Sequence, residues 1–126
     1  MLRASTLGLV VSKTVGESAL YDVIVDCSGR LSRVQVKSVA AESDGAYRLS
    51  VTHGGRTKRG YSPAEIDFVA AYVIPHNAWY IIPASQTAGI KSIHVCPHRS
   101  SNRRFEAYRE AWRLLCQEKT AGEARP

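Results

Sequence analysis

The sequence is poor in cysteine and contains no long apolar run. Its three cysteines, Cys27, Cys96 and Cys116, are widely spaced and odd in number, and no C-x-x-C pair occurs. A zinc site built on paired cysteines is therefore not expected, and reduced thiols are typical of the cytosol. No stretch approaches the roughly 20 apolar residues that span a bilayer, and no signal-peptide pattern is present. These absences predict a cytoplasmic protein with no membrane partner.

The chain also lacks the common catalytic signatures. There is no G-x-x-x-x-G-K-[ST] phosphate loop, no G-x-S-x-G nucleophile turn and no H-E-x-x-H zinc helix. The aromatic signature of an RNA recognition motif is absent as well. His94, Cys96 and His98 would share a face on an extended strand, which suggests a metal site. No fourth ligand is evident, so a role as strand and turn residues is favoured.

The composition is basic and sufficiently apolar to form a core. The chain has 126 residues, 44% of them hydrophobic, with a formal net charge of +6 and a pI of about 9.5. This length predicts a single domain over residues 1–126. The basic excess favours a polyanionic partner, although many small basic proteins bind nothing acidic.

A β-hairpin is the most informative local pattern. Apolar residues alternate over 21–26, a turn follows at 28–30, and the alternation resumes over 31–37. Side chains two apart in a strand share a face, so Gln35 and Lys37 point one way while the valines beside them point into a core. An acid on the first strand is expected to face this polar pair.

The hairpin resembles the PD-(D/E)XK nuclease superfamily. Its first motif is Tyr21-Asp22 and its second is Gln35-Val36-Lys37, most similar to the branch whose second motif reads Gln-Val-Lys, which includes intron-associated homing endonucleases. The similarity covers residues 10–85. It implies an α/β fold of restriction-endonuclease-like type, with a mixed central β-sheet, few flanking helices and a shortened N-terminal helix.

The resemblance also implies a chemistry. Such nucleases hydrolyse phosphodiester bonds with a divalent metal, which offsets the charge on the phosphate and activates water. Asp22 would be the principal ligand, with an amide oxygen from Gln35 and the backbone carbonyl of Val36. These hard oxygen donors suit Mg²⁺, with Mn²⁺ as an alternative. Lys37 would contact the phosphate or orient and help deprotonate the attacking water.

One departure from the family pattern leaves the activity open. Related nucleases place a Glu on a helix before the first active strand, whereas the first acid here is Glu17, in a loop-like stretch. Either Glu17 or Asp26 substitutes for it, or catalysis is weak or absent, and Asp26 is favoured as a turn residue.

The alternative is a catalytically degenerate nucleic-acid-binding module, and a third reading is a structural domain. DNA is the expected partner with RNA as an alternative, and the resemblance implies a homodimer or higher homo-oligomer.

Two basic clusters favour a nucleic-acid partner. One lies in the glycine-rich run 53–61 and the other precedes the C-terminal segment. Glycines let a backbone approach phosphate closely, and cations release condensed counterions on binding DNA. Each cluster alone is equally consistent with a solvated loop. The candidate nucleic-acid-binding residues are Arg56, Lys58, Arg59, Arg99, Arg103 and Arg104.

The remaining segments predict further strands and one helix. Residues 7–11 indicate a short strand or a helix stub, 47–51 a third strand in the hairpin region, and 66–74 and 79–82 two strands joined by a turn. Asp67, which begins the buried strand, is expected to satisfy backbone or an arginine. A helix is predicted at about 102–119, followed by a frayed tail at 120–126. Its apolar stripe is Phe105, Tyr108, Trp112 and Leu115.

Overall fold

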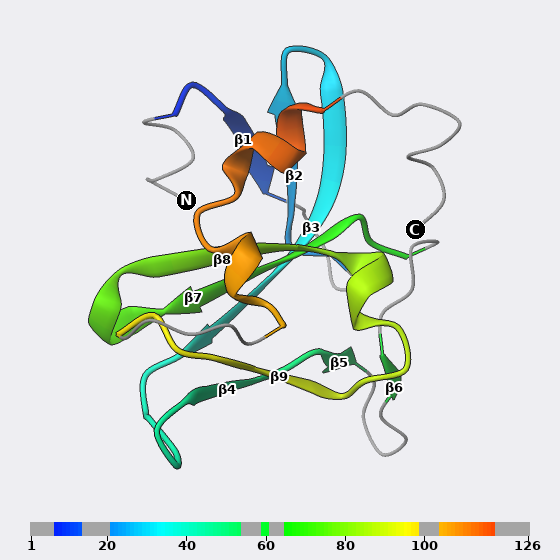
Figure 1. The fold of residues 1–126 in the computed structure, drawn as a ribbon. Coiled ribbons are helices and arrows are strands. Elements are labelled where there is room, and N and C mark those ends of the chain that lie inside the picture. The colour runs from blue at the N-terminus through cyan, green and yellow to red at the C-terminus, as the bar shows by residue number, and fades with distance from the viewer. Residues whose placement is uncertain (1–6, 14–20, 54–58, 61–64, 99–103, 118–126) are drawn as a thin grey trace.

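The centre of the fold is a mixed five-stranded sheet with the strand order β1-β2-β3-β7-β8 (Figure 1). The computed structural model describes residues 7–13, 21–53, 59–60, 65–98 and 104–117. The five strands are β1 (Val10–Lys13), β2 (Val23–Cys27), β3 (Arg30–Val39), β7 (Phe68–Val73) and β8 (Ala78–Pro83). The predicted mixed sheet with few helices is therefore confirmed. Of the segment 7–11, for which a strand or a helix stub was expected, residues 10 and 11 belong to a strand and residues 7 and 8 to a turn.

The predicted hairpin is formed by β2 and β3. The two strands pair antiparallel from Val23 opposite Val34 to Cys27 opposite Arg30. Ser28 and Gly29 make the turn with φ values of 51° and 96°, the combination that a two-residue type I′ turn requires. The backbone N–H of Gly29 donates to Asp26 Oδ1 at 2.8 Å.

Beyond the hairpin, the sheet continues through a parallel pair. β3 runs parallel to β7, with Val34 opposite Phe68 and Val39 opposite Val73, and β7 then pairs antiparallel with β8. A short 3-10 helix, η1 (Ile74–His76), joins these last two strands. The predicted pair of buried strands with a turn between them is confirmed.

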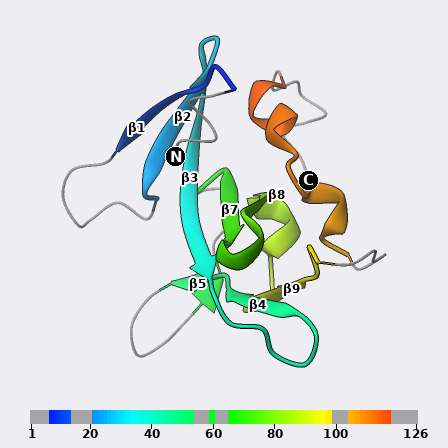
Figure 2. The same cartoon turned by 90° about the vertical axis from the view of Figure 1, so that its left-hand side faces the viewer.

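A second layer covers one face of the main sheet. It consists of β4 (Tyr47–Ser50) paired with β9 (Ser92–Val95), and of β5 (Thr52–His53) paired with β6 (Arg59–Gly60). Figure 2 shows this layer below the main sheet. The expectation that 47–51 extends the hairpin region needs correction, because β7 occupies the place beside β3 and β4 pairs with β9 instead.

The other face is covered by the C-terminal segment, and here the sequence prediction is wrong. Residues 104–117 contain two short 3-10 helices, η3 (Glu106–Tyr108) and η4 (Trp112–Cys116), in place of one continuous helix. Arg109 is extended and Glu110 has φ of 52°. The Glu110 N–H bonds to the carbonyl of Trp79 on β8 at 2.7 Å, so pairing with the sheet edge interrupts the helix.

The cysteine expectation is also wrong in part. Cys27 at the end of β2 and Cys116 at the end of η4 form a disulfide across 89 residues of sequence, while Cys96 is a buried free thiol. The packing of η4 against the hairpin brings the end of β2 and the end of η4 together. Because two of the three cysteines are bonded to each other, the cysteines no longer support the expected cytoplasmic location.

Two cores lie on opposite faces of the main sheet. One is enclosed between the sheet and the β4–β9 layer and includes Val69, Ala71 and Tyr80. The other lies beneath η4 and includes Val34 and Trp112. The remaining 3-10 helix, η2 (Ala84–Thr87), follows β8. None of the helices in the described part of the chain has the length and apolarity that a membrane span needs.

Candidate active site

The carboxylate of Asp22 meets the Gln35-Val36 peptide at the open end of the hairpin. Asp22 Oδ2 accepts hydrogen bonds from Gln35 Nε2 and from the backbone N–H of Val36, each at 2.9 Å. The Asp22 N–H in turn bonds to the carbonyl of Val34 at 2.9 Å. The acid and amide that the sequence placed on neighbouring strands are therefore in direct contact, and the Asp22 side chain is exposed.

Lys37 lies two residues beyond Gln35 on the same face of β3. The parallel pairing sets Gln35 beside Val69 and Lys37 beside Ala71. Val34, between the polar positions of the strand, is 1% exposed in the core beneath η4. This burial fixes the direction of the alternating side chains, because a slip of one residue would place valine outside and glutamine inside. Gln35 and Lys37 are half-buried.

An arginine that sequence reasoning missed adjoins this set. Arg33 precedes Gln35 by two residues and so shares its face. Its Nε donates to Asp67 Oδ2 at 3.1 Å and its Nη2 to Oδ1 at 3.2 Å. The hydrogen bond to Asp67 is the largest cause that raises the pKa of Arg33. Asp67 thus accepts hydrogen bonds from an arginine, as predicted. The two-residue spacing between Arg33 and Gln35 could have indicated from the sequence that Arg33 lies on the same strand face as the site.

The two candidate substitute acids have different outcomes. Glu17 lies outside the described residues. Asp26 is at the turn of the hairpin, where it accepts the Gly29 N–H, so it serves the turn and does not join Asp22. In the described ranges, no three His, Cys, Asp or Glu side chains are grouped so that they could hold a metal ion. The described site has one carboxylate, and its other donors are an amide and peptide groups.

The His-x-Cys-x-His run does not form a metal site. The His98 ring bonds to Glu42 at 3.0 Å, whereas the Cys96 thiol is buried against the Gly45 carbonyl at 3.6 Å. His94 is exposed on β9. His98 and Cys96 thus contact different groups, and among the described residues these side chains are not gathered into a cluster that could hold a metal ion.

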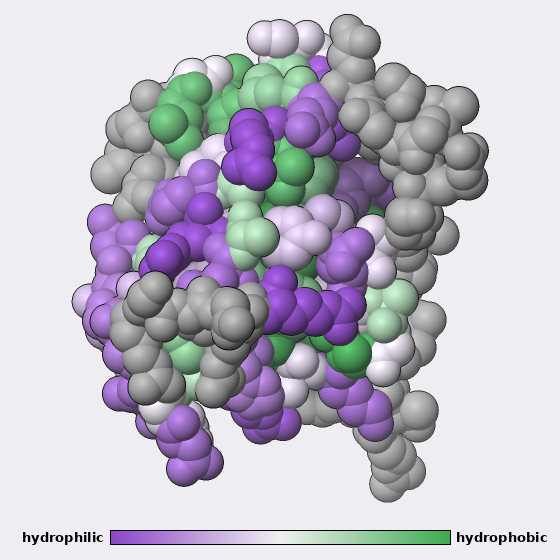
Figure 3. Space-filling view, in the orientation of Figure 1, coloured by the Kyte–Doolittle hydropathy of each residue, from purple (hydrophilic) through white to green (hydrophobic). Residues whose placement is uncertain are grey.

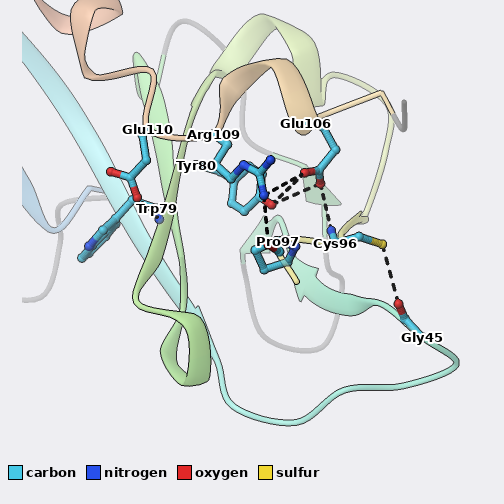
Figure 4. Close-up of polar contacts among 8 residues, drawn as sticks. All are labelled: Gly45, Trp79, Tyr80, Cys96, Pro97, Glu106, Arg109 and Glu110. Atoms are coloured by element: carbon cyan, nitrogen blue, oxygen red, sulfur yellow. Dashed lines mark hydrogen bonds and ion pairs between the residues drawn. The ribbon is translucent and has the colours of Figure 1, made fainter. Parts of the chain in front are cut away.

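A separate polar cluster lies around the carboxylate of Glu106 (Figure 4). The Tyr80 hydroxyl donates to it at 3.1 Å and the Cys96 N–H at 2.8 Å, and Arg109 lies 3.9 Å away. Burial, followed by the negative charge of Glu106, raises the pKa of Tyr80. The cluster joins η3 to β8 and to the end of β9, which is a structural role.

Of the two basic clusters, the structure describes Arg104 and the backbone of Arg59. Arg56, Lys58, Arg99 and Arg103 lie outside the described residues, and Arg59 is described only as part of β6. Arg104 is exposed; its guanidinium lies over the Phe105 ring at 4.9 Å and donates to the carbonyl of Gln86 at 3.0 Å.

Comparison with known proteins identifies the family of the chain. A family model described as PD-(D/E)XK endonuclease matches residues 1–115. The chain belongs to the PD-(D/E)XK endonuclease family. This membership confirms the superfamily resemblance of the sequence.

The family member is also similar to a solved structure, that of the bacterial homing endonuclease I-Ssp6803I. The two chains are 31% identical, with a TM-score of 0.76. The match covers 90% of this chain and 83% of the other, so the likeness extends over most of both chains. No curated protein matches the chain.

Proposed function

We propose that this chain is a divalent-metal-dependent DNA endonuclease of the branch with a Gln-Val-Lys second motif. The observation that supports the proposal is the contact of the Asp22 carboxylate with Gln35 and Val36, with Lys37 on the same strand face. Family membership and the likeness to a homing endonuclease agree with it. The reaction is hydrolysis of a phosphodiester bond.

The donor set suits a hard divalent cation. A carboxylate from Asp22, an amide oxygen from Gln35 and the carbonyl of Val36 are the oxygen types that Mg²⁺ and Mn²⁺ accept. Gln35 directs its NH₂ group at Asp22, and a half-turn of the amide exchanges this nitrogen for the oxygen. When bound, the ion supplies charge neutralisation at the phosphate and an activated water.

The protein groups then position the substrate. Asp22 would hold the ion at the open end of the hairpin. Its side chain is exposed there, so a large polyanion such as DNA can reach the ion. Lys37 contacts the scissile phosphate or holds the attacking water, and its half-buried stem limits where the ammonium can move. The Asp67 carboxylate keeps Arg33 in place next to Gln35, so the cationic edge of the site is ordered before DNA arrives.

DNA is the proposed substrate, with contacts from the basic residues of run 53–61 and from those around residues 99–104. We propose a homodimer or a higher homo-oligomer on the basis of the family resemblance, since cutting both strands of a duplex is often done by two copies of one site.

A second candidate function is supported by the single carboxylate among the described residues of the site. If Asp22 alone binds the ion weakly, the chain is a catalytically degenerate nucleic-acid-binding module of the same fold. The two candidates share the DNA surface and differ in phosphodiester hydrolysis.

Cleavage of supercoiled plasmid in Mg²⁺, in Mn²⁺ and in chelator tests the proposal. We expect wild type to cut only with metal, and Asp22→Ala and Lys37→Ala each to lose activity by about 100-fold or more. The matched controls are Asp26→Ala, an acid of the same hairpin, and Lys13→Ala, an exposed lysine on β1. Both controls should cut at close to the wild-type rate.

The same assay separates the candidates. DNA binding without cleavage in any metal would select the degenerate module. Cleavage that survives both site substitutions would show that the residues are wrongly assigned, because catalysis would then not depend on Asp22 or Lys37. Loss of cleavage in Asp26→Ala, with an intact fold, would move the site to the hairpin turn.

A further inference from the structure

Strand β3 has a different neighbour along each of its two edges. Residues 30–34 pair with β2 along one edge, and residues 34–39 pair with β7 along the other. Pairing with β2 thus stops halfway along the strand, and Figure 2 shows β3 continuing past the start of β2. Beyond residue 34, the β2-side edge of β3 is covered by no strand of the described part of the chain.

Hydrogen bonds show which backbone groups of β3 point to this edge. The N–H of Arg33 donates to Asp67 Oδ2 at 2.7 Å, and its carbonyl accepts the Asp67 N–H at 2.9 Å, so the backbone of Arg33 points toward β7. The Val34 carbonyl accepts the Asp22 N–H, on the β2 side. Odd-numbered residues of β3 therefore direct their backbone groups to β7, and even-numbered residues direct theirs to the opposite edge.

The N–H of Ser38 is the next donor along the β2-side edge. The Val36 N–H already bonds to Asp22 Oδ2 at 2.9 Å. The Ser38 N–H points to the same edge, about 6.6 Å further along the strand, and the Val36 carbonyl lies between the two donors. Among the described residues no acceptor for the Ser38 N–H is found, and Ser38 is exposed. This donor therefore faces solvent next to the Asp22 carboxylate.

Lys37 provides positive charge beside this donor. It stands between Val36 and Ser38, and its half-buried side chain lies on the same strand face as Gln35. An anion at the Asp22–Gln35 contact would meet the Lys37 ammonium from the face of the sheet and the Ser38 N–H in the plane of the sheet. Backbone N–H groups and lysines both bind phosphate. The negative charge of Asp22 opposes such an anion until a divalent cation offsets it.

Another strand fits this edge less well than a phosphate does. Strand addition uses a row of unpaired N–H and C=O groups, whereas β3 ends at Val39, one residue after Ser38. The face of the molecule that carries η3 and η4 does not indicate a phosphate site either, because hydrophobic and hydrophilic residues are mixed across it in Figure 3. A single donor beside a lysine matches a compact anion.

We propose that the backbone N–H of Ser38 binds a non-bridging oxygen of the scissile phosphate, alongside Lys37. The inference rests on the proposed function, because its ligand is the DNA phosphodiester of that same site. It adds a residue beyond the Gln35-Val36-Lys37 motif, and the contribution comes from the direction of the backbone. A donor fixed in the sheet orients the phosphate and stabilises the negative charge that grows on its oxygens during hydrolysis.

The direct test is the amide resonance of Ser38 in isotope-labelled protein. The probe is thymidylyl-thymidine, which has one phosphodiester and requires no target sequence, added to saturation with Ca²⁺, a cation that takes oxygen ligands as Mg²⁺ does. In the free protein, the Ser38 N–H should exchange with solvent faster than the Lys37 N–H, which faces β7.

With the probe and Ca²⁺ together, we expect the Ser38 amide to move downfield and its exchange to slow. Asp22→Ala, which removes the proposed cation ligand, should show neither change. A Ser38 amide that does not respond in wild type, or that responds equally in Asp22→Ala, overturns the assignment.

Cleavage of supercoiled plasmid in Mg²⁺ gives a second readout. Ser38→Pro removes the N–H at an edge where proline breaks no ladder bond, and cleavage should fall about 10- to 100-fold, as expected for one hydrogen bond to a charged group. Ser38→Ala keeps the N–H and should lose less. The control is Lys13→Pro, at an exposed residue of the edge strand β1, which should cut at close to the wild-type rate. Thermal unfolding checks that each variant is folded.

The outcomes separate this inference from the proposed function. Metal-dependent cutting by wild type, with full activity of folded Ser38→Pro, overturns only the assignment of Ser38. If Ser38→Pro does not fold, the amide resonance in wild type decides. A shift of the Ser38 amide in a chain that cuts with no metal supports the phosphate contact and overturns the catalytic function. Neither a shift nor cleavage in wild type overturns both.

Discussion

Glu106 is a buried carboxylate whose side chain is 8% exposed. A charge of this kind costs free energy unless hydrogen bonds replace its water. Glu106 accepts from the Tyr80 hydroxyl and the Cys96 N–H and lies near Arg109. Its burial is therefore compensated within one cluster, and its negative charge adds to the effect of burial in raising the pKa of Tyr80.

The Tyr80→Phe substitution tests this cluster. Because its pKa is raised in the folded state, Tyr80 contributes stability that is complete below its ordinary pKa of 10.0 and is lost as pH rises above it. We expect Tyr80→Phe to lower the unfolding free energy by about 2 kcal/mol at neutral pH. Urea unfolding from pH 8 to 11 should show this difference shrinking above pH 10. A difference that stays constant with pH would contradict the raised pKa.

Residue-level prediction succeeded where the cause was local or periodic. Asp26 was expected in a turn and caps Gly29, and Asp67 was expected to satisfy an arginine and pairs with Arg33. The contact of Asp22 with Gln35 followed from the hairpin and from family resemblance together. The Tyr80–Glu106 contact was not foreseeable, because it joins residues 26 apart that no pattern relates.

At the scale of elements, the C-terminal segment is shaped by the edge of the sheet. β8 is the last strand of the main sheet, and Trp79 would otherwise leave its backbone groups unpaired there. Its carbonyl accepts the Glu110 N–H and its N–H donates to the Glu110 carboxylate. A helix of the expected length has no such groups to offer, because its interior N–H groups are already bonded.

We expect Glu110→Ala to destabilise the protein by about 1–2 kcal/mol, because Trp79 N–H and Trp112 Nε1 both lose an acceptor. Urea unfolding followed by tryptophan fluorescence measures the loss. Glu110→Gln, which keeps one amide oxygen, should recover part of it. Equal stability of Glu110→Ala and wild type would mean that the contacts contribute nothing net.

At the scale of the whole molecule, a disulfide closes the fold. Cys27–Cys116 joins the hairpin to η4, and the Arg30 guanidinium donates to the carbonyls of Leu114 and Gln117 beside it. The bond lies at the turn end of the hairpin, beside the core beneath η4 and away from Asp22. It therefore bears on stability and not on the arrangement of the candidate active site.

Reduction should lower the unfolding free energy by about 4 kcal/mol, because a loop of this length restricts the unfolded chain strongly. Cys27→Ser with Cys116→Ser should reproduce the loss, whereas Cys96→Ser should remain sensitive to reductant. Thiol titration in denaturant checks the pairing: one of the three cysteines should react without reductant and all three after it. Three reactive thiols in unreduced protein would rule the bond out.

The sequence by itself determined the hairpin, the buried strand pair and the residue types of the motif. Alternation fixed which side chains of β2 and β3 share a face, and Ser28-Gly29 fixed the turn, because both depend on residues a few positions apart. Only the tertiary structure decided that β3 lies beside β7, that β4 pairs with β9, and that Cys27 meets Cys116. These contacts join segments far apart in the chain, and their free energy depends on packing that no local pattern encodes.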